Sequence, residues 1–161
     1  DYSLLNNFNN KDNILLPLVL SNTPQKEMQE RLMAVVAPLE IQDYLTKYPY
    51  EVSGGQAQRI AVARAIVTYP KLLLADEPTG ALGSASSQSL MRIFQTLNQN
   101  YRQTILMVTH AVAAAANAHR VLFIKDGRIY NEIYRGEDNN VRFEDRIAKS
   151  LTLLNGGSLH D

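Results

Sequence analysis

The stretch Val52–Leu82, VSGGQAQRIAVARAIVTYPKLLLADEPTGAL, carries the strongest structural signal in the chain. It reads in order as a short loop, a helix, a buried strand and two adjacent carboxylates. Open α/β sheets bind their ligands at the carboxyl ends of their strands, which is where these two acids fall. The segment therefore predicts an α/β protein with a ligand site at residues 76 and 77.

The helix is predicted to begin at a capping box. Ser53 and Gln56 have the Ser-x-x-Gln spacing that satisfies the free amides of a first helical turn. Gly54 and Gly55 lie inside this box, although capping does not require glycine. They allow a ligand to approach bare amides at the positive end of a helix dipole, so they indicate either an anion site or a tight turn. The helix is expected to be mostly buried and to stop before Tyr69-Pro70.

The strand is predicted at Leu72–Ala75, a continuous apolar run that suits a central parallel strand covered on both faces. Asp76 and Glu77 follow directly. Neighbours on an extended chain point to opposite sides, so one carboxylate can hold Mg²⁺ through water while the other accepts a proton from an attacking water. The alternative is a pair of acids that simply end a strand at the surface.

Composition limits the classes of function. The 161 residues can form one domain that buries roughly two-thirds of its unfolded surface. Lys plus Arg and Asp plus Glu each number 16, so no net charge favours nucleic acid or anionic lipid. Without cysteine, disulfides and thiolate metal sites are excluded. No apolar run approaches the ~20 residues of a membrane span, and no signal peptide is apparent.

Before the central stretch the pattern is helical. Residues 13–20 form an apolar segment in which Pro17 is expected to kink or end a helix. Thr23 is predicted to cap a second helix, with Pro24 at its first position. One apolar face of this helix recurs at helical spacing, at Met28, Leu32, Val35, Val36 and Leu39.

After the central stretch helices and strands alternate. We predict an amphipathic helix over residues 84–100, a second buried strand over 104–109, and an alanine-rich helix over 111–118. Asp126-Gly127 predicts a hairpin turn within 121–134. Phe143, Ile147, Leu151 and Leu154 form the apolar stripe of a last helix, which Gly156-Gly157 is expected to end. His110 follows the second strand, at another carboxyl end.

SGGQ, a helix, and then KLLLADEPTGAL together resemble the signature and Walker B motifs of ATP-binding-cassette ATPases. The resemblance implies a partial P-loop NTPase (RecA-like) core with parallel strands, residues 69–161, joined to a helical subdomain, residues 1–68. It also implies the ligands ATP and Mg²⁺. Ser53, Gly54, Gly55 and Gln56 would bind the γ-phosphate of an ATP held by a second copy in a head-to-tail dimer. Asp76 would hold Mg²⁺, Glu77 would be the catalytic base, and His110 would reach the γ-phosphate and position the attacking water.

One position departs from the family pattern. Gly83 stands where the D-loop commonly has aspartate. A glycine lacks the side-chain hydrogen bond of an aspartate, which affects the expected coupling between the two sites of a dimer.

Less specific similarities point to one subfamily of these ATPases. Residues 120–136, RVLFIKDGRIYNEIYRG, and 151–161, LTLLNGGSLHD, resemble the bacitracin-export type of ATPase subunit, which serves transporters of peptide antibiotics. This resemblance implies a membrane permease as partner and a cytoplasmic location on the inner face of a bacterial membrane. The first residues look like the sequence just after the family's Q-loop glutamine, so we expect the carboxyl-terminal part of a longer protein.

No Gly-x-x-x-x-Gly-Lys-Ser/Thr occurs, and none of the eight glycines precedes a lysine. Phosphoryl transfer depends on the positioning and electrostatic stabilisation that such a loop supplies. We therefore expect these 161 residues alone to be inactive as an ATPase. Two other hypotheses are a non-transport relative acting on DNA or ribosomes, and an inert truncated fragment. The neutral charge balance counts against the first, so no nucleic-acid partner is expected.

Overall fold

A computed structural model describes residues 3–156 of the chain, with side chains for residues 3–154. It has α/β architecture and two compact units, Asp1–Leu106 and Met107–Asp161. The family resemblance in the sequence predicts a helical subdomain over residues 1–68 and a nucleotide-binding core over residues 69–161. This division stays a prediction. In chain order the α-helices and strands are α1 Asn10–Leu20, α2 Gln25–Leu39, α3 Gly54–Ile66, β1 Leu72–Asp76, α4 Ser84–Tyr101, β2 Thr104–Val108, α5 Val112–Ala115, β3 Arg120–Lys125, β4 Arg128–Tyr134 and α6 Asn140–Gly156.

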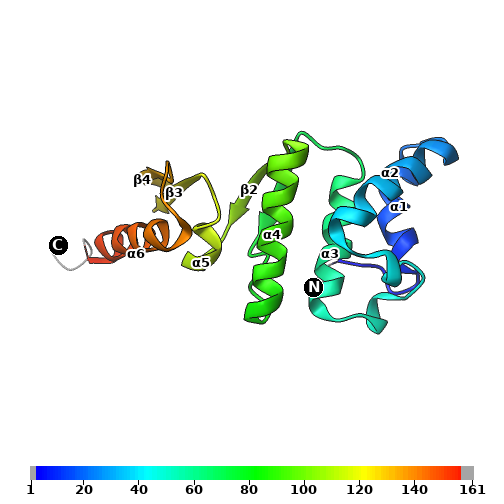
Figure 1. Ribbon diagram of the computed structural model, residues 1–161, viewed down its shortest axis with the longest axis horizontal. Helices are drawn as coiled ribbons and strands as arrows, with labels where there is room; N and C mark the ends of the chain where they lie inside the picture. The colour runs from blue at the N-terminus through cyan, green and yellow to red at the C-terminus, as the bar shows by residue number, and fades with distance from the viewer. Residues whose placement is uncertain (1–2, 157–161) are drawn as a thin grey trace. The chain divides into compact units, whose positions relative to one another are not determined.

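The first unit is built on helices α1 to α4. Helices α1, α2 and α3 contact one another, and α4 contacts α2 and α3 (Figure 1). The predicted apolar face of α2 is confirmed, because four of its five members are buried and Met28 is partly buried. The predicted helix over 84–100 is also confirmed as α4, which buries a stripe at helical spacing, namely Leu90, Met91, Ile93, Phe94 and Leu97.

Two expectations about helix boundaries in this unit change: a helix end at Pro17 is wrong, whereas a kink there stays a prediction, and the expected start of α2 is wrong by one residue. Helix α1 continues through Pro17 to Leu20. Ile14 and Leu18 are 0% and 1% exposed, and their burial offsets the cost of an interior proline. Helix α2 begins one residue later than expected. Its N-cap is Pro24, with φ −58° and ψ 143° and no side-chain cap bond, so Thr23 lies outside the helix.

Strands β1 and β2 pair in a two-stranded sheet, and the architecture is that of a parallel sheet with helices. Both strands form where they were predicted, but the prediction that they are buried on both faces is wrong. Leu73 is buried, whereas Leu74 is 68% exposed and Leu106 of β2 is 52% exposed. Alternate residues of β1 therefore face solvent, since among the described residues this sheet has no third strand.

The second unit packs a hairpin against the last helix. Strands β3 and β4 pair antiparallel, and the turn between them has Asp126 at φ 50° and Gly127 at φ 72°, which confirms the predicted positive-φ pair. Helix α6 contacts both strands and α5. Phe143 and Ile147 of the predicted stripe are buried with Phe123 of β3, while Leu151 and Leu154 pack at the edge of the cluster.

The helices α5 and α6 of this unit bear on two predictions. The alanine-rich segment forms only one turn, α5, and not a helix over 111–118. The Asn117 side chain donates to the carbonyl oxygens of Ala113 (2.8 Å) and Ala114 (3.3 Å) and so occupies the acceptors that a longer helix would use. Helix α6 was predicted to end at Gly156-Gly157. Gly157 lies outside the described residues, so the predicted end stays a prediction.

Candidate functional site

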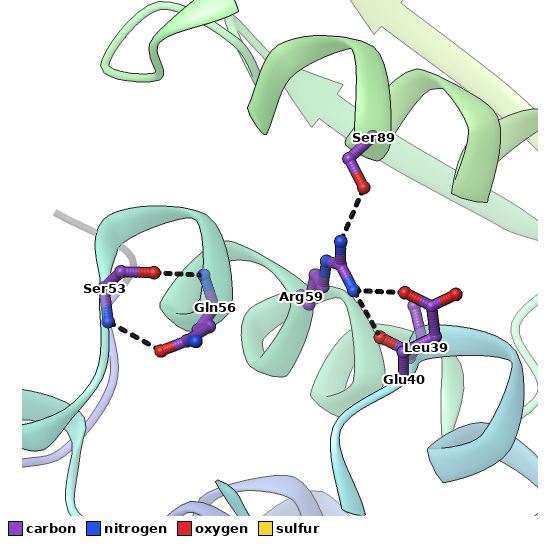
Figure 2. Close-up of polar contacts among 6 residues, drawn as sticks. All are labelled: Leu39, Glu40, Ser53, Gln56, Arg59 and Ser89. Atoms are coloured by element: carbon purple, nitrogen blue, oxygen red, sulfur yellow. Dashed lines mark hydrogen bonds and ion pairs between the residues drawn. The ribbon is translucent and has the colours of Figure 1, made fainter. Parts of the chain in front are cut away.

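The predicted capping box opens α3. Ser53 is the N-cap, with φ −70° and ψ 161°, and its hydroxyl accepts a hydrogen bond from the Gln56 amide at 3.3 Å. The Gln56 side-chain oxygen accepts from the Ser53 amide at 2.9 Å (Figure 2). The two side chains thus satisfy two amides at the start of the helix. Ser53 and Gly54 are exposed, so this helix start faces solvent. We call residues 53–56 the α3 tip.

Gly55 has a packing role that spacing did not predict. A Cβ at this position would lie 3.0 Å from Ser86 Oγ and 3.2 Å from Ser86 Cβ, on the first turn of α4. Ordinary carbon contacts are longer, so a side chain here would displace Ser86. The sequence left two explanations for the glycines, an anion site and a tight turn. Close approach of two helices is a third explanation, for Gly55 alone.

The two predicted carboxylates end β1 as expected. Asp76 is the last residue of the strand and is exposed. Glu77 is half-buried and has φ 43°, and its carbonyl accepts from the Gly80 amide at 3.0 Å. The extended conformation therefore stops at Asp76, so the assumption that alternation carries through to Glu77 is wrong. A left-handed φ at a non-glycine residue is uncommon and concentrates at functional sites.

These acids fit the way proteins hold Mg²⁺ on a nucleotide. Within residues 3–156 no three His, Cys, Asp or Glu side chains gather into a metal cluster. Mg²⁺ keeps several waters and is held by one or two carboxylates together with substrate phosphates, so it needs no such cluster. The exposed Asp76 carboxylate is suited to that role.

Helix α4 begins without a side-chain cap. Its N-cap is Gly83, with φ −65° and ψ 162°, and nothing lies within 4 Å of a Cβ built there. The conformation is an ordinary one for any residue, and space is available. The backbone at residue 83 would therefore accept the aspartate that the D-loop commonly has, so it does not require a glycine.

His110 is exposed and lies in the second unit, two residues after the end of β2. The chain turns here, since the Ala111 amide donates to the Thr109 hydroxyl at 3.1 Å. Asp76, Glu77 and the α3 tip belong to the first unit. The roles predicted for all seven residues stay predictions.

Sequence patterns missed three side chains that join separate segments of the first unit. Arg59 connects α3 to two other helices. The fully buried Asn13 of α1 bonds the backbone of Leu5 in both directions, at 2.7 and 3.0 Å. Asn10, also fully buried, donates to the Tyr44 carbonyl at 2.9 Å, in the segment that leads to the α3 tip. An asparagine inside the predicted apolar segment 13–20 is a signal for Asn13, whereas Asn10 precedes that segment and no pattern pointed to it.

Comparison with known proteins identifies the family. The sequence profile of the family described as ABC transporter matches residues 1–80. The chain belongs to the ATP-binding domains of this family. Among the described residues, no helix combines the length and apolar character needed to cross a membrane.

The curated relatives narrow this class. The chain is 45% identical over its whole length to the ABC transporter ATP-binding protein YxdL of Bacillus subtilis and covers 62% of that protein. It is 44% identical over 97% of its length to the bacitracin export ATP-binding protein BceA of Halalkalibacterium halodurans, again covering 62%. The lipoprotein-releasing system ATP-binding protein LolD of Aquifex aeolicus is 43% identical over 77% of the chain, which covers 55% of that relative.

Solved structures show the same fold. The dimeric ABC transporter cassette MJ0796 is 31% identical, with a TM-score of 0.70 over 83% of this chain and 59% of the cassette. Another structure of MJ0796, 30% identical, is dimeric and bound to ADP and phosphate in a post-hydrolysis state. The structure of cbiO1 from Clostridium perfringens, part of the ABC transporter complex cbiONQ, is 23% identical, with a TM-score of 0.79 over 94% of this chain and 59% of that chain, and supports the fold alone.

Proposed function

We propose that this chain is part of the ATP-binding subunit of a transporter that uses ATP hydrolysis to export an antimicrobial peptide. The observation that carries the proposal is the exposed, capped α3 tip together with the exposed Asp76 at the end of β1. A helix start presents amides and a positive dipole end to an anion, and a carboxylate at a strand end holds a cation. A nucleotide with bound Mg²⁺ has both charges.

The residues have separate roles in this proposal. The α3 tip of one copy donates to the γ-phosphate of a nucleotide bound by a second copy, which requires a head-to-tail dimer. Asp76 is the residue that holds Mg²⁺, whose charge stabilises the phosphates. Glu77 accepts the proton of the attacking water, and His110 orients that water and contacts the γ-phosphate. The partners are a second copy and a membrane permease, at the cytoplasmic face of a bacterial membrane.

The transported class comes from similarity to the bacitracin export relative, which matches 97% of the chain. The test is bacitracin susceptibility of a sensitive bacterium that expresses the full subunit with its permease. We expect resistance with the wild-type subunit and loss of resistance with Glu77→Gln. Glu30→Gln, at an exposed position of α2, is the matched control and should keep resistance. Equal resistance with both variants would contradict the proposal.

These 161 residues by themselves are proposed to lack ATPase activity, because no Gly-x-x-x-x-Gly-Lys-Ser/Thr segment occurs among them. The backbone amides and the lysine of such a segment are most of the groups that position the nucleotide phosphates. Calorimetric titration of the 161-residue chain with MgATP should show no micromolar binding. Micromolar affinity would contradict this part of the proposal and leave the transport role intact.

A further inference from the structure

Arg59 of α3 connects three helices of the first unit. One guanidinium nitrogen, Nη1, donates to the Leu39 carbonyl at 3.4 Å and to Glu40 Oε2 at 2.8 Å, both at the end of α2. The other, Nη2, donates to Ser89 Oγ of α4 at 2.5 Å. Figure 2 shows the side chain reaching in both directions from α3.

The two ends of this bridge differ in strength. The Arg59 side chain is 20% exposed, whereas Glu40 is 75% exposed, so the ion pair is at the surface and contributes little by itself. The Leu39 carbonyl belongs to the last turn of α2, where carbonyl groups have no partner within the helix and a cation is favoured. Ser89 is a neutral acceptor on the half-buried side of α4. A planar guanidinium with several donors can satisfy all three acceptors, whereas an ammonium group cannot hold both ends.

Gly55 and Ser86 make a second contact between the same two helices. Gly55 and Arg59 are four residues apart on α3, and Ser86 and Ser89 are three apart on α4, so each pair lies on one face of its helix. A Cβ at position 55 would be tight against Ser86, at 3.0 Å from its Oγ and 3.2 Å from its Cβ. The first turns of α3 are therefore fixed against α4 at two points. Helix α4 begins at Ser84, seven residues after Glu77.

We propose that Arg59 is a positioning residue for hydrolysis: through Ser89 and the end of α2 it sets the direction in which the α3 tip presents its amides to the terminal phosphate. This inference rests on the proposed function. Arg59 contacts no nucleotide itself. Its bridge fixes the α3 tip to the helix that follows the Asp76–Glu77 turn. A tip displaced by about 1 Å would lose much of its effect on a transition state that depends on alignment.

The test compares variants of the full ATP-binding subunit by steady-state ATPase kinetics, with urea denaturation of each. Arg59→Gln removes both ends of the bridge, and Ser89→Ala removes only the α4 end. Arg92→Gln, at an exposed position of α4, is the matched control. We expect Arg59→Gln to lower kcat at least ~10-fold and Ser89→Ala to lower it severalfold, with little change in KM. The double variant should be no worse than Arg59→Gln, because both changes break one bridge.

The outcomes separate the two proposals. A wild-type subunit without ATPase activity would contradict the proposed function. An active wild type in which Arg59→Gln and Ser89→Ala keep a normal kcat, with or without a change in stability, would overturn the role of Arg59. If Arg59→Gln does not fold, Ser89→Ala decides, since it removes one hydroxyl from a half-buried position.

Discussion

Gly55 of α3 and Ser86 of α4 approach so closely that a Cβ at position 55 would lie 3.0 Å from the serine oxygen and 3.2 Å from its Cβ. The hydroxyl can rotate away, but the serine Cβ is fixed by its backbone. A methyl group at residue 55 therefore requires Ser86 to shift by a few tenths of an ångström. This relationship makes the glycine a packing residue whatever it binds.

Gly55→Ala should have opposite effects in two backgrounds. Alanine is the better helix former by up to ~1 kcal/mol, while overpacking costs ~1 to 3 kcal/mol. We expect Gly55→Ala to be stabilising in a Ser86→Gly background and neutral or destabilising in the wild type. Urea denaturation of the four proteins gives the coupling free energy, predicted at about 1–2 kcal/mol. Equal effects in both backgrounds would show that the two residues do not touch.

Gly83→Asp should stabilise the chain. Gly83 is the N-cap of α4, with room for a side chain and an ordinary φ of −65°. An aspartate there can accept from a first-turn amide and interacts favourably with the helix dipole, for a gain of about 0.3–1 kcal/mol in the free energy of unfolding. Gly83→Ala, which offers no acceptor, is the control and should be less stable than the wild type. Aspartate and alanine variants of equal stability would contradict a capping effect.

Phe143→Ala should be the most damaging single change tested in the second unit. Phe143 is 0% exposed and packs with Phe123 and Ile147, so its truncation should lower the free energy of unfolding by about 3–5 kcal/mol. Val141, two residues earlier on α6, is 69% exposed. Val141→Ala should therefore change the free energy of unfolding by less than about 0.5 kcal/mol. Denaturation followed by circular dichroism measures both. Similar losses for the two would mean that the stripe does not form the core.

The hairpin should have a pH dependence set by Glu132. The Tyr134 hydroxyl donates to the Glu132 carboxylate and Arg120 pairs with it at 2.5 Å, so the pKa of Glu132 is lowered. A lowered pKa in the folded state means that the stabilisation is complete above the ordinary glutamate pKa and is lost as pH falls through the lowered one. Tyr134→Phe removes the hydroxyl hydrogen bond, which is the largest cause of the lowered pKa, and should therefore raise the pKa of Glu132. NMR shifts of the Glu132 carboxyl carbon as a function of pH measure this pKa. Tyr130→Phe, on the same strand, should leave the titration unchanged.

Local signals predicted local structure well. The Ser53–Gln56 capping box and the Asp126-Gly127 turn depend on neighbours in sequence, and both form as predicted. Amphipathic periodicity likewise located α4 and α6. The ABC family and its α/β fold were predicted from the SGGQ and DEPTGAL motifs and are confirmed.

Predictions that needed tertiary information were less successful. A continuous apolar run does not say which faces of a strand are covered, and Leu74 and Leu106 are exposed. Alternation assumed an extended backbone at Glu77, whose φ is 43°. The bridge made by Arg59 joins residues 20 and 30 apart in sequence, and the bonds of Asn13 reach the backbone eight residues away, outside the predicted segment, so no spacing rule could locate them.

The central claim is that the α3 tip of one copy and the two acids of another form one catalytic site. Mixing two inactive full-length variants, Gly54→Asp at the tip and Glu77→Gln at the acids, tests it directly by ATPase activity. In a head-to-tail dimer each mixed pair has one intact site, so the mixture should regain about a quarter of wild-type activity. The control is wild type mixed with the double variant Gly54→Asp with Glu77→Gln, whose mixed pairs have no intact site; only wild-type pairs are active, so about a quarter of wild-type activity should remain, against about half if each copy held a complete site. A mixture of the single variants no more active than either alone would contradict the account.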